Sequence, residues 1–247
     1  MSERFIELDA ARGVAIIMMV IFHLVYDLAY LQYLSSTVYR TGFFYYFGLT
    51  TTILFIGIAG VSVTISGSRA EREKGKKEIL WKFLRRGLGL ILLGMLISLC
   101  TYLFLGGSGY VVFGILHLIG VCVILTPFFL RLRFINALIG FCIILITPLM
   151  TQFSGPFWLI PIGIHPDTFY SVDYEPMLPW FGVFLLGMGI GSLLYPNGIT
   201  CFRKITRQNC VHLCMAPFAA AGRHSLIIYL LHQPVIISIL IILGTLL

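Results

Sequence analysis

Charged residues are scarce in this chain of 247 residues, in which Asp, Glu, Lys and Arg together make up only 11%. Soluble globular domains carry about 25% charged residues, which coat their surface. Hydrophobic residues make up 59% of the chain, more than the core of a soluble globule of this length would bury. The composition therefore excludes a soluble protein and predicts an all-α, polytopic transmembrane bundle, with residues 1–247 as a single domain.

Features of several other protein classes are missing. The six cysteines show no secreted disulfide framework, because three lie in apolar runs and three in one basic segment. Cys210, His212 and Cys214 have close spacing, but no second pair completes a zinc site, so we expect no metal. The net charge of +7 lies in short loops between apolar runs, which indicates membrane topology and no nucleic-acid partner. The first apolar run contains His23 and Asp27 and lacks a small-residue cleavage site, so we expect it to remain as a span.

Apolar runs of about 20 residues recur along the chain and predict membrane-spanning helices. Seven such spans are expected, at residues 8–31, 43–66, 84–105, 111–130, 134–151, 177–195 and 224–246. Between the second and third spans, the segment SRAEREKGKKEILWKFLRR predicts an amphipathic helix on the membrane surface. Basic connections follow at 131–133 and 196–223. No internal repeat or second soluble domain is evident.

The basic residues determine the orientation of these spans. With a cytoplasmic N-terminus, sixteen of the seventeen Lys and Arg residues fall on the inner side and only Arg40 falls outside. This asymmetry is what the positive-inside rule requires. The segments that then face outward are 31–42, 106–110 and 152–176, the last of which carries the acidic residues Asp167, Asp173 and Glu175.

The first span is hydrophobic yet carries titratable groups along one face. At about 100° per residue, Asp9, Arg12, His23 and Asp27 fall within a sector of about 60°. An ionisable residue at membrane depth usually faces the protein interior or a wet cavity. Asp9 and Arg12 could reach the interface by snorkelling, but the His23 side chain is too short to do so. We therefore predict a functional site around His23.

Polar residues also occur in or beside later spans. His117 lies in span four, and Asp173 and Tyr174 precede span six. Span seven carries His224, His232 and Gln233, and Arg223 directly precedes it. Structural interpretations stay open for several of them. His117 could be a hydrogen-bonded core histidine, and His224 could cap the last helix together with Ser225. His232 and Gln233 could bond backbone carbonyls freed by Pro234.

The first span has the groups that proton transfer requires. Imidazole suits proton transfer near neutral pH, and Asp27, four residues after His23, could orient it. Arg12 lies about 16 Å from His23 along the same helix, near the inner surface. This layout suits a long, anionic, cytoplasmic donor, and acyl-CoA fits this description.

Several segments carry a resemblance to a known family. They are RFIELDAARGVAII, FHLVYDLAYL, FGILHLIG, SVDYEPMLPWFGVFLLGMGIG and AGRHSLIIYLLHQPV, in this order from end to end. With them the chain resembles the prokaryotic membrane proteins similar to heparan-α-glucosaminide N-acetyltransferase, within the transmembrane acyltransferase superfamily. That superfamily associates an Arg-x10-His pattern on the first helix with acyl transfer, and Arg12 and His23 fit the pattern. The resemblance implies a prokaryotic plasma-membrane protein whose acceptor is an envelope sugar or amino sugar.

These observations give one set of expected site residues. We expect His23 and Asp27 in catalysis, and Arg12, Arg223 and His224 around the acyl-CoA co-substrate. Residues expected near the acceptor are His117, Asp173, Tyr174, His232 and Gln233, with His117 or His232 as a hydrogen-bond donor to the oxyanion.

The predicted reaction moves an acyl group, expected to be acetyl, from cytoplasmic acyl-CoA to a hydroxyl or amine at the outer face. His23 acts either as the base or as an acylated intermediate. A small-solute or proton-coupled transporter is the alternative, because a polar face in a span also suits conduction. An assembly subunit is a third interpretation. Membrane lipid is an expected partner, and glycine-rich faces on spans three and six would allow a homodimer without requiring one.

Overall fold

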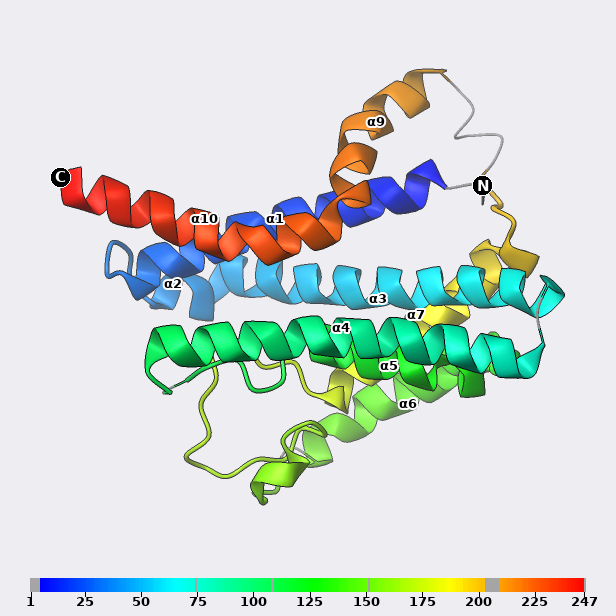
Figure 1. Ribbon diagram of the computed structural model, residues 1–247, viewed down its shortest axis with the longest axis horizontal. Helices are drawn as coiled ribbons and strands as arrows, with labels where there is room; N and C mark the ends of the chain where they lie inside the picture. The colour runs from blue at the N-terminus through cyan, green and yellow to red at the C-terminus, as the bar shows by residue number, and fades with distance from the viewer. Residues whose placement is uncertain (1–4, 74, 108, 151, 203–208, 247) are drawn as a thin grey trace. The chain divides into compact units, whose positions relative to one another are not determined.

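The computed structural model describes residues 5–73, 75–107, 109–150, 152–202 and 209–246 (Figure 1). The helices are α1 (Ile6–Tyr30), α2 (Thr37–Arg40), α3 (Gly42–Glu73), α4 (Lys76–Leu105), α5 (Ile115–Phe129), η1 (Leu130–Leu132), α6 (Ile135–Met150), η2 (Phe157–Leu159), α7 (Met177–Leu194), η3 (Pro196–Gly198), α9 (Asn209–Arg223) and α10 (Ser225–Leu246). The chain divides into two compact units, one of residues 1–58 with 202–247 and one of residues 59–201. The helix α3 contributes to both.

The predicted helical membrane bundle is confirmed. Within the described residues, six helical segments are long and apolar enough to cross a membrane, namely α1, α3, α4, α5 with η1, α7 and α10. The span expected at 134–151 is present as α6, which is apolar but has only 16 residues. The protein is therefore an integral membrane protein.

Two connections differ from the prediction. The expected surface helix between the second and third spans is absent as a separate element, because α3 extends to Glu73 and α4 already begins at Lys76. Charged residues in this segment therefore lengthen two spanning helices. The basic connection 196–223 contains the helix α9, which a search for apolar runs of about 20 residues could not detect because the helix has only 15 residues. The side chain of Cys210 lies outside the described part of the chain.

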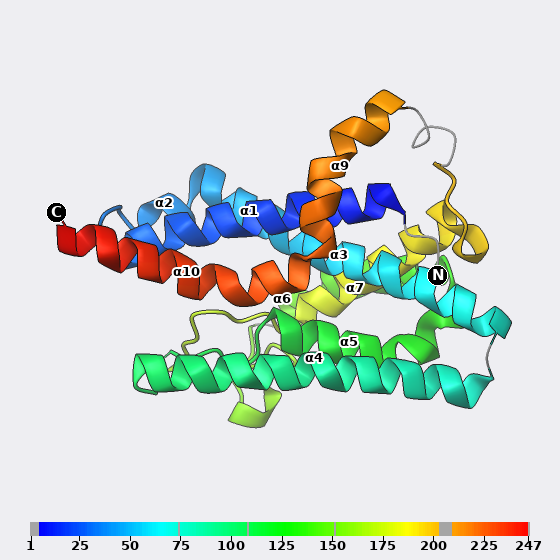
Figure 2. The ribbon, with the colours of Figure 1, turned by 45° about the horizontal axis from the view of Figure 1, so that its top comes forward.

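In the first unit, α1 packs closely against α9 through two glycines. A Cβ atom on Gly13 would lie 1.8 Å from the carbonyl oxygen of Phe218. A Cβ atom on Gly222 would lie 1.8 Å from the carbonyl oxygen of Asp9. Small residues allow helix backbones to approach in this way within membranes. The contact holds the last turn of α9 against the first half of α1, and α10 then continues beside α1 (Figure 1, Figure 2).

In the second unit, glycines again bring helices together in pairs. Gly87 of α4 faces Gly120 of α5, and Gly140 of α6 faces Gly182 of α7, so that an added Cβ atom would come within 3 Å of the opposite backbone. Gly189 of α7 packs against Ala137 of α6. Many large apolar side chains lie exposed on the outer helix faces, where lipid can cover them.

We predict that Gly13→Ala and Gly222→Ala each destabilise the protein by about 2–3 kcal/mol, because the added methyl group overpacks against backbone that cannot move aside. Thermal unfolding in detergent measures this change. Gly57→Ala is the matched control, since a Cβ atom there meets nothing within 4 Å. Equal unfolding temperatures for all three variants would contradict the close packing of α1 and α9.

Candidate functional site

Two polar residues of α1 meet two polar residues of α10 in the first unit. The rings of His23 and His232 lie with centroids 4.7 Å apart and planes at 87°. One turn further along α1, the Asp27 carboxylate accepts a hydrogen bond from the Gln233 side-chain amide at 2.8 Å. We call His23, Asp27, His232 and Gln233 the α1–α10 polar cluster. The structure thus brings together the residues expected in catalysis and two of those expected near the acceptor.

The partner of His23 differs from the expected one. Asp27 does not orient this ring, because its carboxylate turns to Gln233 on α10. Instead, Nδ1 of His23 lies 3.0 Å from the carbonyl oxygen of Met19, one helical turn earlier. A carbonyl oxygen can only accept a hydrogen bond, so Nδ1 must carry the proton. In the neutral ring Nε2 is then unprotonated, which is the state that a general base requires.

His232 has the same arrangement as His23. Its Nδ1 donates to the carbonyl oxygen of Tyr229, so Nε2 of the neutral ring again has the free lone pair. The expectation that His232 bonds a carbonyl freed by Pro234 is wrong in detail, because the proline removes the partner of the Leu230 carbonyl and not that of Tyr229. The α1–α10 polar cluster therefore presents two unprotonated imidazole nitrogens in contacting rings.

Three atoms of the cluster are buried without a hydrogen-bond partner among the described residues. They are Oδ2 of Asp27, Nε2 of His232 and Oε1 of Gln233. Only 4% of Asp27 is exposed. Buried polar atoms in folded proteins are nearly always bonded, so unpaired ones indicate a place for a ligand or an ordered water. The cluster can therefore receive hydroxyl or amine hydrogens from a bound molecule.

The residues expected around the donor lie toward the N-terminal end of α1. Arg12 forms an ion pair with Asp9 at 2.8 Å, so part of its charge is already compensated. Arg223 and His224 are exposed where α9 ends and α10 begins. The backbone of Gly222, next to Arg223, contacts the backbone of Asp9. The close packing of α9 thus brings Arg12 and Arg223 to the same end of the first unit.

The remaining expected residues gather in the second unit, at the start of α5. The segment 171–175 pairs with 109–114, through hydrogen bonds from Val172 to Gly109 at 2.8 Å and from Glu175 to Phe113 at 2.9 Å. This pairing places the Asp173 carboxylate against Gly114, whose added Cβ atom would lie 2.6 Å from Oδ2. Tyr174 donates to the carbonyl oxygen of Ile160 at 2.6 Å.

His117 is oriented differently from the histidines of α1 and α10. Its Nδ1 accepts a hydrogen bond from the backbone N–H of Gly114 at 3.3 Å. In the neutral ring the proton therefore lies on Nε2, which is buried and has no partner among the described residues. His117 thus keeps an N–H donor, whereas neutral His23 and His232 keep acceptors. The bond to Nδ1 agrees with the structural interpretation of His117, and the unpaired Nε2 leaves its expected role near the acceptor open.

Burial changes the acid–base properties of the segment before α7. It raises the pKa of the Asp173 carboxyl to about 6, although a hydrogen bond from the backbone of Ile115 opposes the shift. Burial also raises the pKa of Tyr174 to about 12. Asp173 therefore changes charge near neutral pH, while it lies at the N-terminus of α5, where a negative charge is favoured.

Sequence reasoning missed the groups that determine the histidine tautomers. These groups are the backbone carbonyls of Met19 and Tyr229, four and three residues before the histidines. Their signal was available, because a side chain in a helix can bond the carbonyl one turn earlier. Within the described residues, no group of three or more His, Cys, Asp and Glu side chains is placed to bind a metal.

Comparison with known proteins gives one match. The model of a family described as heparan-alpha-glucosaminide N-acetyltransferase, catalytic, matches residues 4–234. These residues include every member of the α1–α10 polar cluster and the start of α5. No curated protein and no solved structure matches the chain.

We predict that Gln233→Leu destabilises the protein by about 2 kcal/mol, because it leaves the buried Asp27 carboxylate without its donor. A double-mutant cycle with Asp27→Leu, followed by thermal unfolding, measures the coupling of the two side chains. The loss of unfolding free energy in the double variant should be smaller, by at least about 1 kcal/mol, than the sum of the losses in the two single variants. Strict additivity would show that the hydrogen bond does not join them.

A second prediction concerns pH. The ordinary pKa of Asp173 is 3.8 and its folded value is about 6, so the folded protein binds more protons between these values than the unfolded chain. The stability of the protein should therefore fall as pH rises from about 4 to about 7, by up to about 3 kcal/mol, and stay level above 7.

Unfolding temperatures from pH 4 to 8 test this dependence against Asp173→Asn, which should lack it. Asp167→Asn is the matched control, because it makes the same charge change at an exposed position of the same outer segment. If Asp173→Asn keeps the pH dependence of the wild-type protein, the protonation of Asp173 is not its source.

Proposed function

Because the chain belongs to the heparan-alpha-glucosaminide N-acetyltransferase family, we propose that it transfers an acetyl group from acetyl-CoA to an envelope sugar or amino sugar. Family membership indicates a membrane acetyltransferase. The donor, the acceptor and the catalytic base belong to the proposal. The observation that carries it is the unprotonated Nε2 of His23, next to His232 and the unpaired atoms of Asp27 and Gln233.

The proposed chemistry begins with removal of a proton from the acceptor. Nε2 of His23 takes the proton of the acceptor hydroxyl or amine as its oxygen or nitrogen attacks the thioester carbonyl. A new C–O or C–N bond forms and the C–S bond breaks. The protonated imidazole then returns its proton to the departing CoA sulfur, so the ring ends as it began. The Nδ1–H bond to Met19 holds the ring in the required tautomer throughout.

The other members of the α1–α10 polar cluster position the acceptor. Oε1 of Gln233 and Oδ2 of Asp27 can accept hydrogen bonds from further hydroxyl or amine groups of the sugar. Sugars offer several such groups around one ring, and a site with several unpaired acceptors matches them. Nε2 of neutral His232 can accept a further hydrogen bond from the sugar. It can donate a hydrogen bond to an oxyanion only when the ring is protonated.

The donor enters from the inner side in this proposal. The expected donor residues lie toward the opposite end of α1 from Asp27, and they are Arg12, Arg223 and His224. Arg12 lies about 16 Å along the helix from His23. Arg12 is held by Asp9, and Arg223 and His224 are exposed, so these groups can meet CoA phosphates. The distribution of Lys and Arg supports a cytoplasmic N-terminus, and a prokaryotic cell is part of the proposal.

We predict that His23→Ala lowers acetyl transfer at least about 100-fold, as expected for loss of a general base. Transfer from radiolabelled acetyl-CoA to a panel of amino sugars and oligosaccharides measures it, with purified protein in lipid nanodiscs. His212→Ala is the matched control, because this histidine of α9 is exposed and lies outside the cluster. It should keep the wild-type rate.

Acetyl-CoA binding to the same variants separates chemistry from folding. A ligand that binds only the folded protein raises its unfolding temperature, and His23→Ala should keep this rise while losing transfer. Release of one CoA per protein in the absence of acceptor would identify an acylated His23. Acetyl transfer at the wild-type rate by His23→Ala would refute His23 as the base. Transport of a solute in the absence of acetyl-CoA would instead support the transporter.

A further inference from the structure

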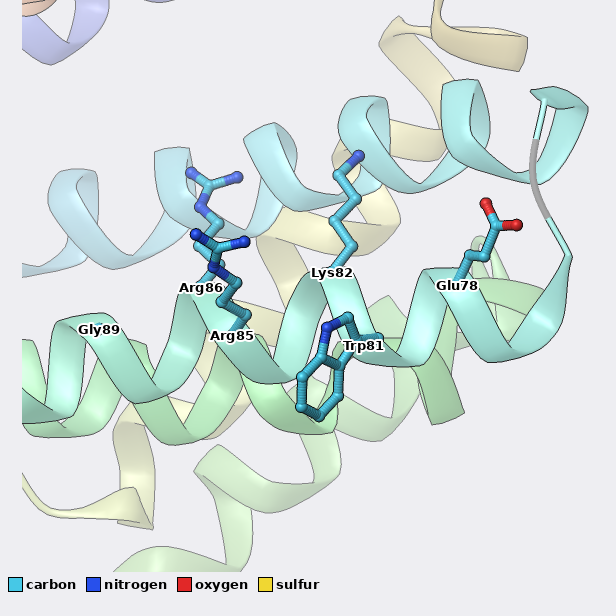
Figure 3. A pocket seen from close by; sticks show the side chains of 6 residues that line it. All are labelled: Glu78, Trp81, Lys82, Arg85, Arg86 and Gly89. Carbon is cyan, nitrogen blue, oxygen red and sulfur yellow. The ribbon is translucent and has the colours of Figure 1, made fainter.

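One face of α4 carries a row of six residues outside the clusters described above, and three of them, Lys82, Arg85 and Arg86, are basic. Its members are spaced three and four residues apart, so they lie on one stripe of the helix. They line a depression of about 540 Å³ in the second unit and are Glu78, Trp81, Lys82, Arg85, Arg86 and Gly89 (Figure 3). We call this row the α4 basic stripe.

Two of the three positive charges of the stripe, those of Arg85 and Arg86, lie on the surface. Arg85 and Arg86 are exposed, and within the described chain neither has an ion pair or a hydrogen bond. Lys82 donates to the carbonyl oxygen of Ser66 at 3.0 Å, which holds its ammonium group in place. Figure 3 shows both guanidinium groups extending from α4 on the same side as Lys82. Such a group of donors matches a phosphate.

The length of α4 indicates that the stripe lies at the depth of lipid phosphates. The helix α4 ends at Leu105, and a helix needs about 20 residues to cross the hydrocarbon core. Counting back 20 residues from Leu105 reaches Arg86. Arg85 and Arg86 therefore lie at the boundary of the hydrocarbon, and Lys82 lies one turn further out. Trp81, which is 65% exposed, is at the level where tryptophans are enriched.

Apolar residues continue the same face into the hydrocarbon. At about 100° per residue, Leu92, Leu96, Leu99 and Leu103 lie within about 40° of Arg85. Leu92 is 69% exposed and Leu103 is 72% exposed. Between the basic and apolar parts is Gly89, where an added Cβ atom would meet nothing within 4 Å. A molecule with an anionic head and a long apolar chain fits this order of groups.

We infer that the α4 basic stripe binds an anionic phospholipid of the leaflet expected to be cytoplasmic. The headgroup phosphate lies against Lys82, Arg85 and Arg86, its glycerol passes Gly89, and an acyl chain follows the leucines of α4. A soluble phosphate would use the cations but would gain nothing from the leucines, so the apolar track favours a lipid. The inference is independent of the proposed acetyl transfer.

Native mass spectrometry of the delipidated full chain tests this site. The probes are dioleoyl phosphatidylglycerol and dioleoyl phosphatidylcholine, which differ in headgroup charge. The wild-type protein should retain phosphatidylglycerol in preference. Arg85→Gln with Arg86→Gln should lower this affinity about 30-fold, since each basic residue near a membrane surface contributes about a factor of five.

Two further variants make the test specific. Lys76→Gln with Lys77→Gln removes the same charge from exposed positions of the same helix and should leave binding unchanged. Gly89→Leu keeps every charge but fills the path of the glycerol, and it should lower binding. Unchanged binding in the Arg85 and Arg86 variant, or equal loss in the Lys76 and Lys77 variant, would overturn the site.

The same spectra distinguish other occupants. Displacement of the lipid by acetyl-CoA would overturn the inference in favour of a soluble phosphate ligand. A change of oligomeric state in the Arg85 and Arg86 variant, without loss of lipid, would overturn it in favour of an interface between copies of the chain. Size-exclusion chromatography confirms that each variant is folded before it is compared.

Discussion

A polar side chain within a membrane span must find its hydrogen bonds inside the protein, because hydrocarbon provides none. This constraint governs the first unit. His23 uses a backbone carbonyl of its own helix, and Asp27 uses Gln233 of α10. The second bond requires α10 to lie beside α1, and α9, just before α10, packs against α1 through Gly13 and Gly222. The atoms left unpaired after these bonds are the ones available to a substrate.

Much of the architecture follows from residue patterns. Apolar runs located the spanning helices to within a few residues at most ends, because hydrophobic length reports directly on membrane crossing. The common face of Asp9, Arg12, His23 and Asp27 also pointed to the helix face that meets α10. The pairing of His23 with His232 was not foreseeable in this way, since no periodicity within α1 specifies which residue of another helix opposes it.

The features that the sequence did not predict have local physical causes. A spacing of four residues allows Asp27 to reach His23, but the competing amide of Gln233 is distant in sequence and cannot be seen there. The helix α9 has only 15 residues, too few for a search for apolar runs of about 20 residues, and its close contact with α1 is evident only from the backbone distances at Gly13. The composition of the charged ends of α3 and α4 predicted a separate surface helix, because composition does not reveal that a spanning helix continues beyond the bilayer.

The unbroken course of α1 has a consequence for the size of the donor. Arg12 and His23 belong to one helix without a proline or a break, so their separation along its axis stays close to 16 Å. The helix therefore fixes the length that a donor must have to contact both residues. A donor that bonds Arg12 through its anionic end can bring its acyl group to His23 only if the connecting arm has that length. A short activated acyl compound can contact Arg12 or His23 but cannot contact both.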